Sequence, residues 1–318
     1  MYHSWMGVRT TSGSLWRGWF AAGLALLVAG CGVPQHRGAP LAIGVESQYA
    51  DVLSQIGGPY IRVRAILSNP STDPHAFEAS PTVAREVAGA SLVVMNGLGY
   101  DAWITRIMAA SPSAHRQVID VRRLLGRPAD TLNPHFWYDP RTMPAVAEAA
   151  ARVFSALDPA HAAYFQTQVQ RFSASLGPWR GALEAFRKDH VGTPVAVTEP
   201  VANALLEAAG CRILTPLALQ LAVMNGTDPA PQDVAAARAL LRMHLVRVLV
   251  YNQQVTNPLT ASFLQLAHAE HIPVVGVYET LPRGYHYQGW MQAELQALHA
   301  EVTRGVSTRT LGTSGVSP

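Results

Sequence analysis

The stretch "LAIGVESQYADVLSQIGGPYIRVRAIL" (Leu41–Leu67) decides the fold class of this 318-residue chain. Its two ends, Leu41–Val45 and Ile61–Leu67, are short β-branched apolar runs of the length of buried strands. Between them, "YADVLSQIGG" places apolar residues at three- and four-residue steps, which is helical spacing. A strand, a helix and a second strand in this order predict a βα unit of a mainly parallel sheet.

The same alternation continues along the chain and stops only once. Further strands are expected at Ser91–Met95, Gln117–Ile119, Pro194–Thr198, Cys211–Thr215, Val246–Tyr251 and Pro273–Tyr278, and helices after Ser80 and at Val201–Ala209, Pro231–Met243 and Leu259–Glu270. From Pro140 to Lys188 only helical patterns occur, with a break at Asp158-Pro159 and a kink expected near Gly177-Pro178. The sequence therefore predicts an α/β fold with two lobes on either side of a helical spine.

The N-terminus resembles an export signal. Arg9 and Arg17 precede an apolar run, Trp19–Gly30, that is shorter than the ~20 residues needed to span a bilayer and ends in "VAGC" (Val28–Cys31). This pattern is typical of a bacterial lipoprotein, with cleavage before Cys31 and a lipid on that cysteine. The alternative is a cytosolic protein with an apolar N-terminal helix. We expect a signal peptide (1–30), a linker (31–40), an N-terminal lobe (41–140), a spine (141–190), a C-terminal lobe (191–304) and a disordered tail (305–318). The protein is expected to be a monomer, anchored to the membrane by its lipid and located outside the cytoplasm.

Charge and motifs exclude several classes of protein. The formal charge of +3 is small, and the arginines form no run of the kind that a nucleic-acid-binding surface requires. No HExxH, GxSxG, GxGxxG or Walker motif occurs. The sequence therefore favours a binding protein without catalytic activity, although a metal-dependent hydrolase stays open as an alternative.

Four side chains that can bind metals follow predicted strands. His75 and His135 lie in loops after strands of the first lobe, and Glu199 and Glu279 directly follow "VAVT" and "VVGVY" in the second. Ligands of parallel α/β sheets bind beyond the carboxyl ends of the strands, so these four are candidates for one site. Two imidazoles and two carboxylates suit a divalent transition metal, and the two carboxylates balance its charge.

Each of these residues has an ordinary interpretation when it is taken alone. A histidine after a proline is usually a solvated loop residue, and a glutamate in a loop is usually exposed. The prediction therefore depends on their joint placement. Of the other histidines, His286 in "RGYHYQGW" could line a pocket. Glu78 is interpreted as a partner that orients a histidine ligand.

Two motifs carry a family resemblance. "DPHAFE" (Asp73–Glu78) and "NPHFWYDP" (Asn133–Pro140), followed by "DPAHAAYF" (Asp158–Phe165), resemble those of the metal-binding lipoproteins of bacterial ABC importers for zinc and manganese. The resemblance covers roughly Leu41 to Arg304. It implies two lobes joined by a long rigid helix, a metal between the lobes, and a membrane permease as partner.

On this pattern His75, His135, Glu199 and Glu279 correspond to the four ligands. The fourth ligand is usually Asp in the family, so Glu279 is one methylene longer, and Tyr251 and Asn252 are the alternative oxygen donors. The resemblance implies one bound Zn(II) or Mn(II) as cargo. Oxygen donors suit Mn(II), whereas intrinsic affinity rises toward Zn(II), so both metals stay open. A surface adhesin, a metal chaperone and an importer component for an organic ligand such as a siderophore are further alternatives.

Overall fold

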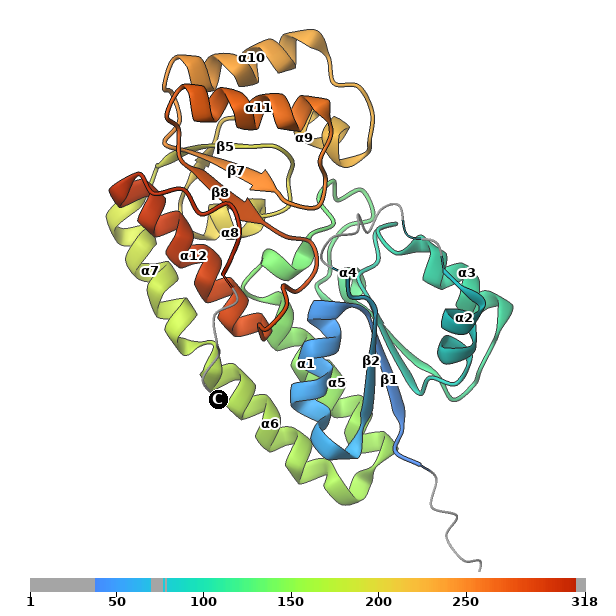
Figure 1. Ribbon diagram of the computed structural model, residues 1–318. Helices are drawn as coiled ribbons and strands as arrows, with labels where there is room; N and C mark the ends of the chain where they lie inside the picture. The colour runs from blue at the N-terminus through green and yellow to red at the C-terminus, as the bar shows by residue number, and fades with distance from the viewer. Residues whose placement is uncertain (1–37, 70–76, 78, 313–318) are drawn as a thin grey trace, which may run out of the picture. The chain divides into compact units, whose positions relative to one another are not determined.

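The computed structural model describes residues 38–69, 77 and 79–312 of the chain (Figure 1). The predicted signal peptide, Cys31, His75 and Glu78 lie outside the described residues. Within the described residues, no helix has both the length and the apolar character needed to cross a bilayer.

Two four-stranded parallel sheets confirm the predicted fold class. The first sheet has the order β2-β1-β3-β4, and its elements are β1 (Leu41–Glu46), α1 (Ser47–Gly57), β2 (Arg62–Leu67), α2 (Pro81–Ala88), β3 (Leu92–Met95), α3 (Ala102–Ala110), β4 (Gln117–Asp120) and α4 (Val121–Leu124). The second has the order β6-β5-β7-β8, with β5 (Pro194–Val197), α8 (Asn203–Ala208), β6 (Arg212–Ile213), α9 (Leu217–Met224), α10 (Pro231–Arg242), β7 (Val248–Asn252), α11 (Pro258–Ala269), β8 (Val274–Val277) and α12 (Tyr287–Arg304). The strand order is the same in both sheets, so each has a switch point beside its first strand.

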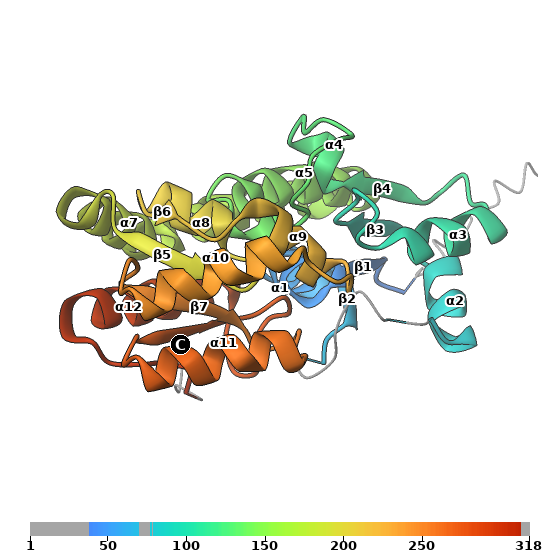
Figure 2. The same cartoon turned by 90° about the horizontal axis from the view of Figure 1, so that it is seen from above.

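Helices cover both faces of each sheet. In the views of Figures 1 and 2, α2 and α3 lie on one side of the first sheet and α1 and α5 (Thr142–Leu157) on the other. Helices α10 and α11 cover the outer face of the second sheet, where they pack with Leu249 and Tyr251 of β7. Burial on both faces explains why strands such as β3, β7 and β8 are continuous apolar runs in the sequence and do not alternate.

The spine consists of two helices that lie nearly end to end. Helix α6 (Ala162–Ser175) packs against α1 and α5, and α7 (Gly177–His190) packs against α12. They are separated at Leu176, close to the predicted kink, because Pro178 has no N–H to continue the helical hydrogen bonds of the preceding turn. The spine thus connects helices of the first lobe to a helix of the second.

A single apolar core extends through both lobes and the spine. It includes Val94 of β3, Phe165 of α6, Trp179 of α7, Val275 of β8 and Trp290 of α12. Because these side chains are almost fully buried and protein interiors are close-packed, a shift of one lobe against the other would open voids in this core.

Part of the segment that we expected to be a disordered tail lies against β8 instead. The N–H of Thr308 donates to Val274 (3.0 Å), and the N–H of Gly276 donates to Thr308 (2.9 Å). A side chain at Gly276 would overlap the carbonyl of Arg309, so this approach requires glycine. The segment covers an edge strand whose backbone groups would otherwise lack partners.

A buried hydrogen-bond cluster joins the two lobes at Tyr138, in the short 3₁₀ helix Phe136–Tyr138. Its hydroxyl accepts from the N–H of Tyr278 (3.2 Å) and lies 2.9 Å from both the Tyr278 carbonyl and Glu294 Oε1. Trp290 Nε1 donates to the same oxygen of Glu294 (2.6 Å). Burial raises the pKa of Glu294 to about 8.

We predict that Glu294→Gln makes the protein less sensitive to rising pH. The folded state binds the Glu294 proton more tightly than the unfolded state, so its contribution to the unfolding free energy falls by about 1 kcal/mol per pH unit between roughly pH 5 and pH 8. Denaturant unfolding at pH 5 and pH 8 should therefore show the variant gaining stability relative to the unsubstituted chain as pH rises. The exposed control Glu184→Gln should not, and equal pH slopes for the chain and Glu294→Gln would refute the assignment.

Candidate functional site

His135 is held in one orientation by Asn133. Asn133 Nδ2 donates to the carbonyl of Pro200 in the second lobe (2.8 Å), which fixes the direction of the amide. Its Oδ1 accepts from the His135 backbone N–H (3.0 Å) and lies 2.7 Å from Nδ1. Nδ1 therefore carries a proton and donates it to Asn133, which leaves Nε2 as the ring atom that can bind a proton or a metal.

The loop that carries His135 is tied on both sides. Asn96, directly after β3, donates Nδ2 to the carbonyl of Pro134 (2.8 Å) and accepts from the hydroxyl of Tyr49 (2.7 Å). On the other side, Asp139 accepts from Arg127 (2.6 Å) and Arg141 (2.7 Å). The conformation of the "NPHFWYDP" motif is thus set before any ligand binds.

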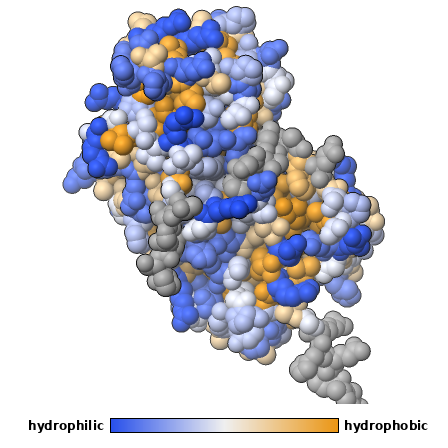
Figure 3. Space-filling model, in the orientation of Figure 1, coloured by the Kyte–Doolittle hydropathy of each residue, from blue (hydrophilic) through white to orange (hydrophobic). Residues whose placement is uncertain are grey.

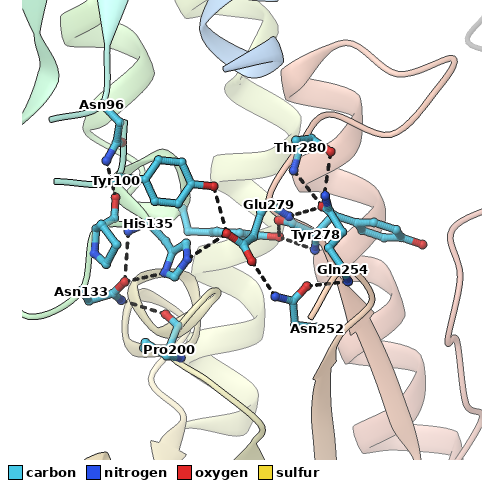
Figure 4. Close-up of polar contacts among 12 residues, drawn as sticks. Asn96, Tyr100, Asn133, His135, Pro200, Asn252, Gln254, Tyr278, Glu279 and Thr280 are labelled. Atoms are coloured by element: carbon cyan, nitrogen blue, oxygen red, sulfur yellow. Dashed lines mark hydrogen bonds and ion pairs between the residues drawn. The ribbon is translucent and has the colours of Figure 1, made fainter. Parts of the chain in front are cut away.

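Glu279 is fully buried and receives donors from both lobes (Figure 4). Tyr100 of the first lobe donates its hydroxyl to Oε2 (2.9 Å), and Asn252 of β7 donates Nδ2 to Oε1 (2.7 Å). Burial, and then the charge of Glu279, raise the pKa of Tyr100 well above its ordinary value, so this hydroxyl keeps its proton and remains a donor.

The Glu279 backbone is fixed as firmly as its carboxylate. Gln254 Oε1 accepts from the N–H groups of Glu279 (2.6 Å) and Thr280 (2.9 Å). Gln48 of α1 donates to the Glu279 carbonyl (3.1 Å). The loop after β8 is therefore held by residues of both lobes.

The two candidate ligands His135 and Glu279 meet at the carboxyl ends of β4 and β8. His135 Nε2 lies 3.3 Å from Glu279 Oε2, and both side chains are buried. Two atoms with lone pairs face each other favourably at this distance only when a proton or a metal cation lies between them. The ring edges of Tyr100 and Trp137 surround His135 and limit the access of water.

The structure gives less information on the other two candidate ligands, Glu199 and His75. Glu199 is 3% exposed and follows β5, next to the Pro200 carbonyl that accepts from Asn133. His75 lies outside the described residues and follows β2 in the sequence. Within the part of the chain that the structure describes, no three His, Cys, Asp or Glu side chains gather closely enough to hold a metal on their own.

The structure assigns other roles to the alternative oxygen donors. Tyr251 packs in the apolar cluster under α10 and α11, on the face of the sheet away from the site. Asn252 orients Glu279 through Nδ2, while its Oδ1 accepts from the N–H of Gln254 (2.9 Å). His286, the other histidine considered, is exposed and pairs with Asp51 (2.6 Å).

Sequence reasoning missed the residues that position the candidate ligands. Asn96, Tyr100 and Gln254 all follow the third strand of a sheet, at the same edge as the candidates. The rule that functional residues follow parallel strands could have found them in "NGLGYD" and "YNQQ".

A second pair of carboxyl groups is buried in the first lobe. Asp101 accepts from the N–H groups of Asn96 (2.6 Å) and Gly97 (3.0 Å), and burial raises its pKa to about 6. Burial, with a further contribution from the Asp101 charge, raises the pKa of Glu46 well above its ordinary value. Burial is the main cause, and it makes Glu46 harder to ionise than an exposed glutamate.

Comparisons with known proteins show which family the chain matches. Residues 46–301 match the family described as zinc-uptake complex component A, periplasmic. The chain is similar to the manganese-binding lipoprotein MntA of Halalkalibacterium halodurans, with 28% identity over 125 residues, or 36% of this chain and 41% of that protein. It is also similar to the metal ABC transporter substrate-binding lipoprotein SloC of Streptococcus mutans, with 24% identity over 150 residues, or 42% of this chain and 47% of that protein. The matched segments span less than half the length of these two curated relatives.

Solved structures share the fold at low sequence identity. The periplasmic zinc-binding protein TroA from Treponema pallidum superposes with a TM-score of 0.70 and 13% identity, over 85% of this chain and 100% of that one. The Mn-bound periplasmic metal-binding protein from Candidatus Liberibacter asiaticus gives 0.64 and 17%, over 83% and 99%. At these identities the likeness shows the fold.

We predict that Asn133→Ala frees the His135 ring to change its tautomer. Without Oδ1, Nδ1 has no acceptor, so the proton redistributes between the two ring nitrogens. Nitrogen-15 chemical shifts of His135 in the metal-free protein report this population directly. The exposed control Asn225→Ala should leave the shifts unchanged, and a fully retained Nδ1 proton in Asn133→Ala would show that Asn133 does not set the tautomer.

Proposed function

Because this chain belongs to the family of periplasmic zinc-uptake complex component A proteins, as its match over residues 46–301 shows, we propose that it captures a divalent transition metal outside the cytoplasm and delivers it to an ABC permease. The cargo is one Zn(II) or Mn(II) per chain. The protein is monomeric and is held at the membrane by a lipid on Cys31. It performs no catalysis, and nothing in the family match supports the hydrolase alternative.

The observation that carries this proposal is the contact between His135 and Glu279. An imidazole nitrogen and a carboxylate oxygen from different lobes face each other at 3.3 Å in a buried position. A divalent cation replaces the proton that this contact requires and gains one nitrogen and one oxygen ligand. Binding therefore releases protons, and affinity falls as pH falls.

Two further ligands complete the proposed set. Glu199, buried after β5, supplies a second carboxylate, so that the two glutamates neutralise the charge of the cation. His75 supplies the fourth ligand; it follows β2, which pairs with β1 at the carboxyl edge of the first sheet, where Glu46 and Leu67 are register partners. The relatives' names include both zinc and manganese, so the proposal covers both metals.

We predict that each of His75→Ala, His135→Ala, Glu199→Gln and Glu279→Gln weakens metal binding by more than the roughly 10–100-fold that loss of an outer hydrogen-bond partner produces. Elemental analysis of the purified protein should find one metal per chain, and calorimetric titration with Zn(II) and with Mn(II) gives the affinities.

The control for these variants is His286→Ala, which removes an exposed histidine and should bind both metals like the unsubstituted chain. Normal binding by His135→Ala and Glu279→Gln together would disprove the site. Normal binding by His75→Ala or Glu199→Gln alone would remove only that residue from the ligand set.

We predict that Tyr100→Phe weakens metal binding by about 10–100-fold without changing the stoichiometry. The variant keeps the ring that packs on His135 but loses the hydroxyl that fixes Glu279 Oε2. The matched control is Tyr60→Phe, whose ring stacks on His161 away from the site. Equal affinities for Tyr100→Phe, Tyr60→Phe and the unsubstituted chain would show that the hydroxyl does not position the ligand.

A further inference from the structure

The amino-terminal edge of the second sheet lies opposite the edge that carries the candidate metal site. Its surface combines exposed apolar side chains with basic ones. Strands β5, β6 and β7 begin at this edge, and helices α7, α10 and α12 end there, because strands and helices of a parallel α/β lobe run in opposite directions. In Figure 1 it is the left-hand end of the upper lobe. We call the exposed residues of this edge the basal face.

The basal face gathers most of the large exposed apolar side chains. Seven such side chains are exposed among the described residues, and four of them are here: Val191 (70%), Met243 (66%), Val306 (50%) and Leu245 (47%). Met243 and Leu245 flank His244, whose positive φ of 51° turns the chain sharply between α10 and β7. In Figure 3 a hydrophobic spot lies within hydrophilic surface at this end of the upper lobe.

Basic side chains surround these apolar residues. The basal face has three carboxylates, Asp189, Glu207 and Glu270. Its exposed lysine and arginine residues number seven: Arg187, Lys188, Arg212, Arg242, Arg247, Arg304 and Arg309. Glu270 is already paired with His244 at 3.6 Å.

Helix ends explain only some of these charges. Arg187, Arg242 and Arg304 lie in the last turns of α7, α10 and α12, where cations interact favourably with the helix dipole. Arg212 and Arg247 lie at the starts of strands, where there is no such dipole to balance. The basal face therefore has positive charge beyond what its helices require.

A cavity opens on the same face. It has a volume of about 600 Å³ and lies between the end of α11 and the segment that follows α12. Its polar lining includes His268, His271 and Arg309, and no carboxylate, while Leu264 and Ile272 supply apolar wall. Donors and cations without a negative charge suit an anionic group.

We propose that the basal face binds the surface of an anionic membrane. The lysine and arginine side chains contact lipid phosphates, the cavity accepts a headgroup, and the four apolar side chains enter the boundary between headgroups and acyl chains. The charge and the apolar residues act together, because each basic residue near an anionic surface contributes only about 1 kcal/mol.

The test is co-sedimentation of the full chain with vesicles of phosphatidylglycerol and phosphatidylcholine, and with phosphatidylcholine alone. Every chain carries Cys31→Ser, so that no acyl group at this position holds the protein on the membrane. The test variant combines Lys188→Gln, Arg242→Gln and Arg247→Gln. Its matched control combines Arg106→Gln, Arg123→Gln and Arg171→Gln, which remove three exposed arginines outside the basal face.

The unsubstituted chain and the control variant should bind the anionic vesicles more tightly than the neutral ones, and added salt should weaken this binding. The test variant should lose on the order of 100-fold in partitioning if its three charges act independently. Met243→Ser should also weaken binding to the anionic vesicles, with the salt dependence retained.

Equal loss in the two triple variants, or equal binding of the unsubstituted chain to both kinds of vesicle, would overturn the proposal. Unchanged vesicle binding by the test variant, together with lost binding to the detergent-solubilised permease, would show a protein-docking surface instead. The metal titrations are independent of this outcome, because the test variant leaves all four proposed ligands in place.

Discussion

A buried carboxylate that depends on both lobes is the interaction from which the rest of the structure follows. Glu279 has no exposed surface, and removing an ionised carboxylate from water costs several kcal/mol unless charge-assisted hydrogen bonds replace the lost solvent. Those bonds come from Tyr100 in the first lobe and Asn252 in the second, with His135 beside them. The partners of this carboxylate therefore come from both lobes.

The apolar core keeps these donors at the required distances. Trp137 follows His135 by two positions. It lies in the same core cluster as Trp179 of the spine and Trp290 of α12. The Tyr138 hydroxyl bonds to the backbone of Tyr278, the residue immediately before Glu279. His135 and Glu279 thus each have a near neighbour in the sequence that contacts the opposite lobe or the spine. A displacement of 1 Å between the lobes would disturb packing and hydrogen bonds at once, so the two ligands meet in a preset geometry.

The strands could be predicted because the local sequence determines them. The hydrogen-bond partners in the site could not, because each pair depends on residues that are far apart in the sequence. All eight predicted strands are present, since each coincides with a short apolar run, and strands such as β3, β7 and β8 are buried along their whole length. Helix α12 was not predicted because its buried stripe includes Glu294 and Glu301, which interrupt the apolar pattern. Helix α9, "LALQLAVM", is apolar on every side and has no period to detect. The Tyr100–Glu279 bond joins residues 179 positions apart, and no local pattern encodes such a pair.

The two lobes also carry similar residue types at corresponding strand ends. Because the sheets have the same strand order, β1, β3 and β4 correspond to β5, β7 and β8. An asparagine follows or ends the third strand in each lobe: Asn96 donates to the loop that carries His135, and Asn252 donates to Glu279 itself.

A glutamate stands at the end of the first strand in each lobe, Glu46 and Glu199, but their surroundings differ. Asp101 lies beside Glu46, and burial together with that charge raises the pKa of Glu46 well above its ordinary value. In the proposed ligand set, the first lobe supplies imidazole nitrogen and the second supplies carboxylate oxygen. This asymmetry places the negative charge that a divalent cation requires on one side, and the softer nitrogen donor on the other.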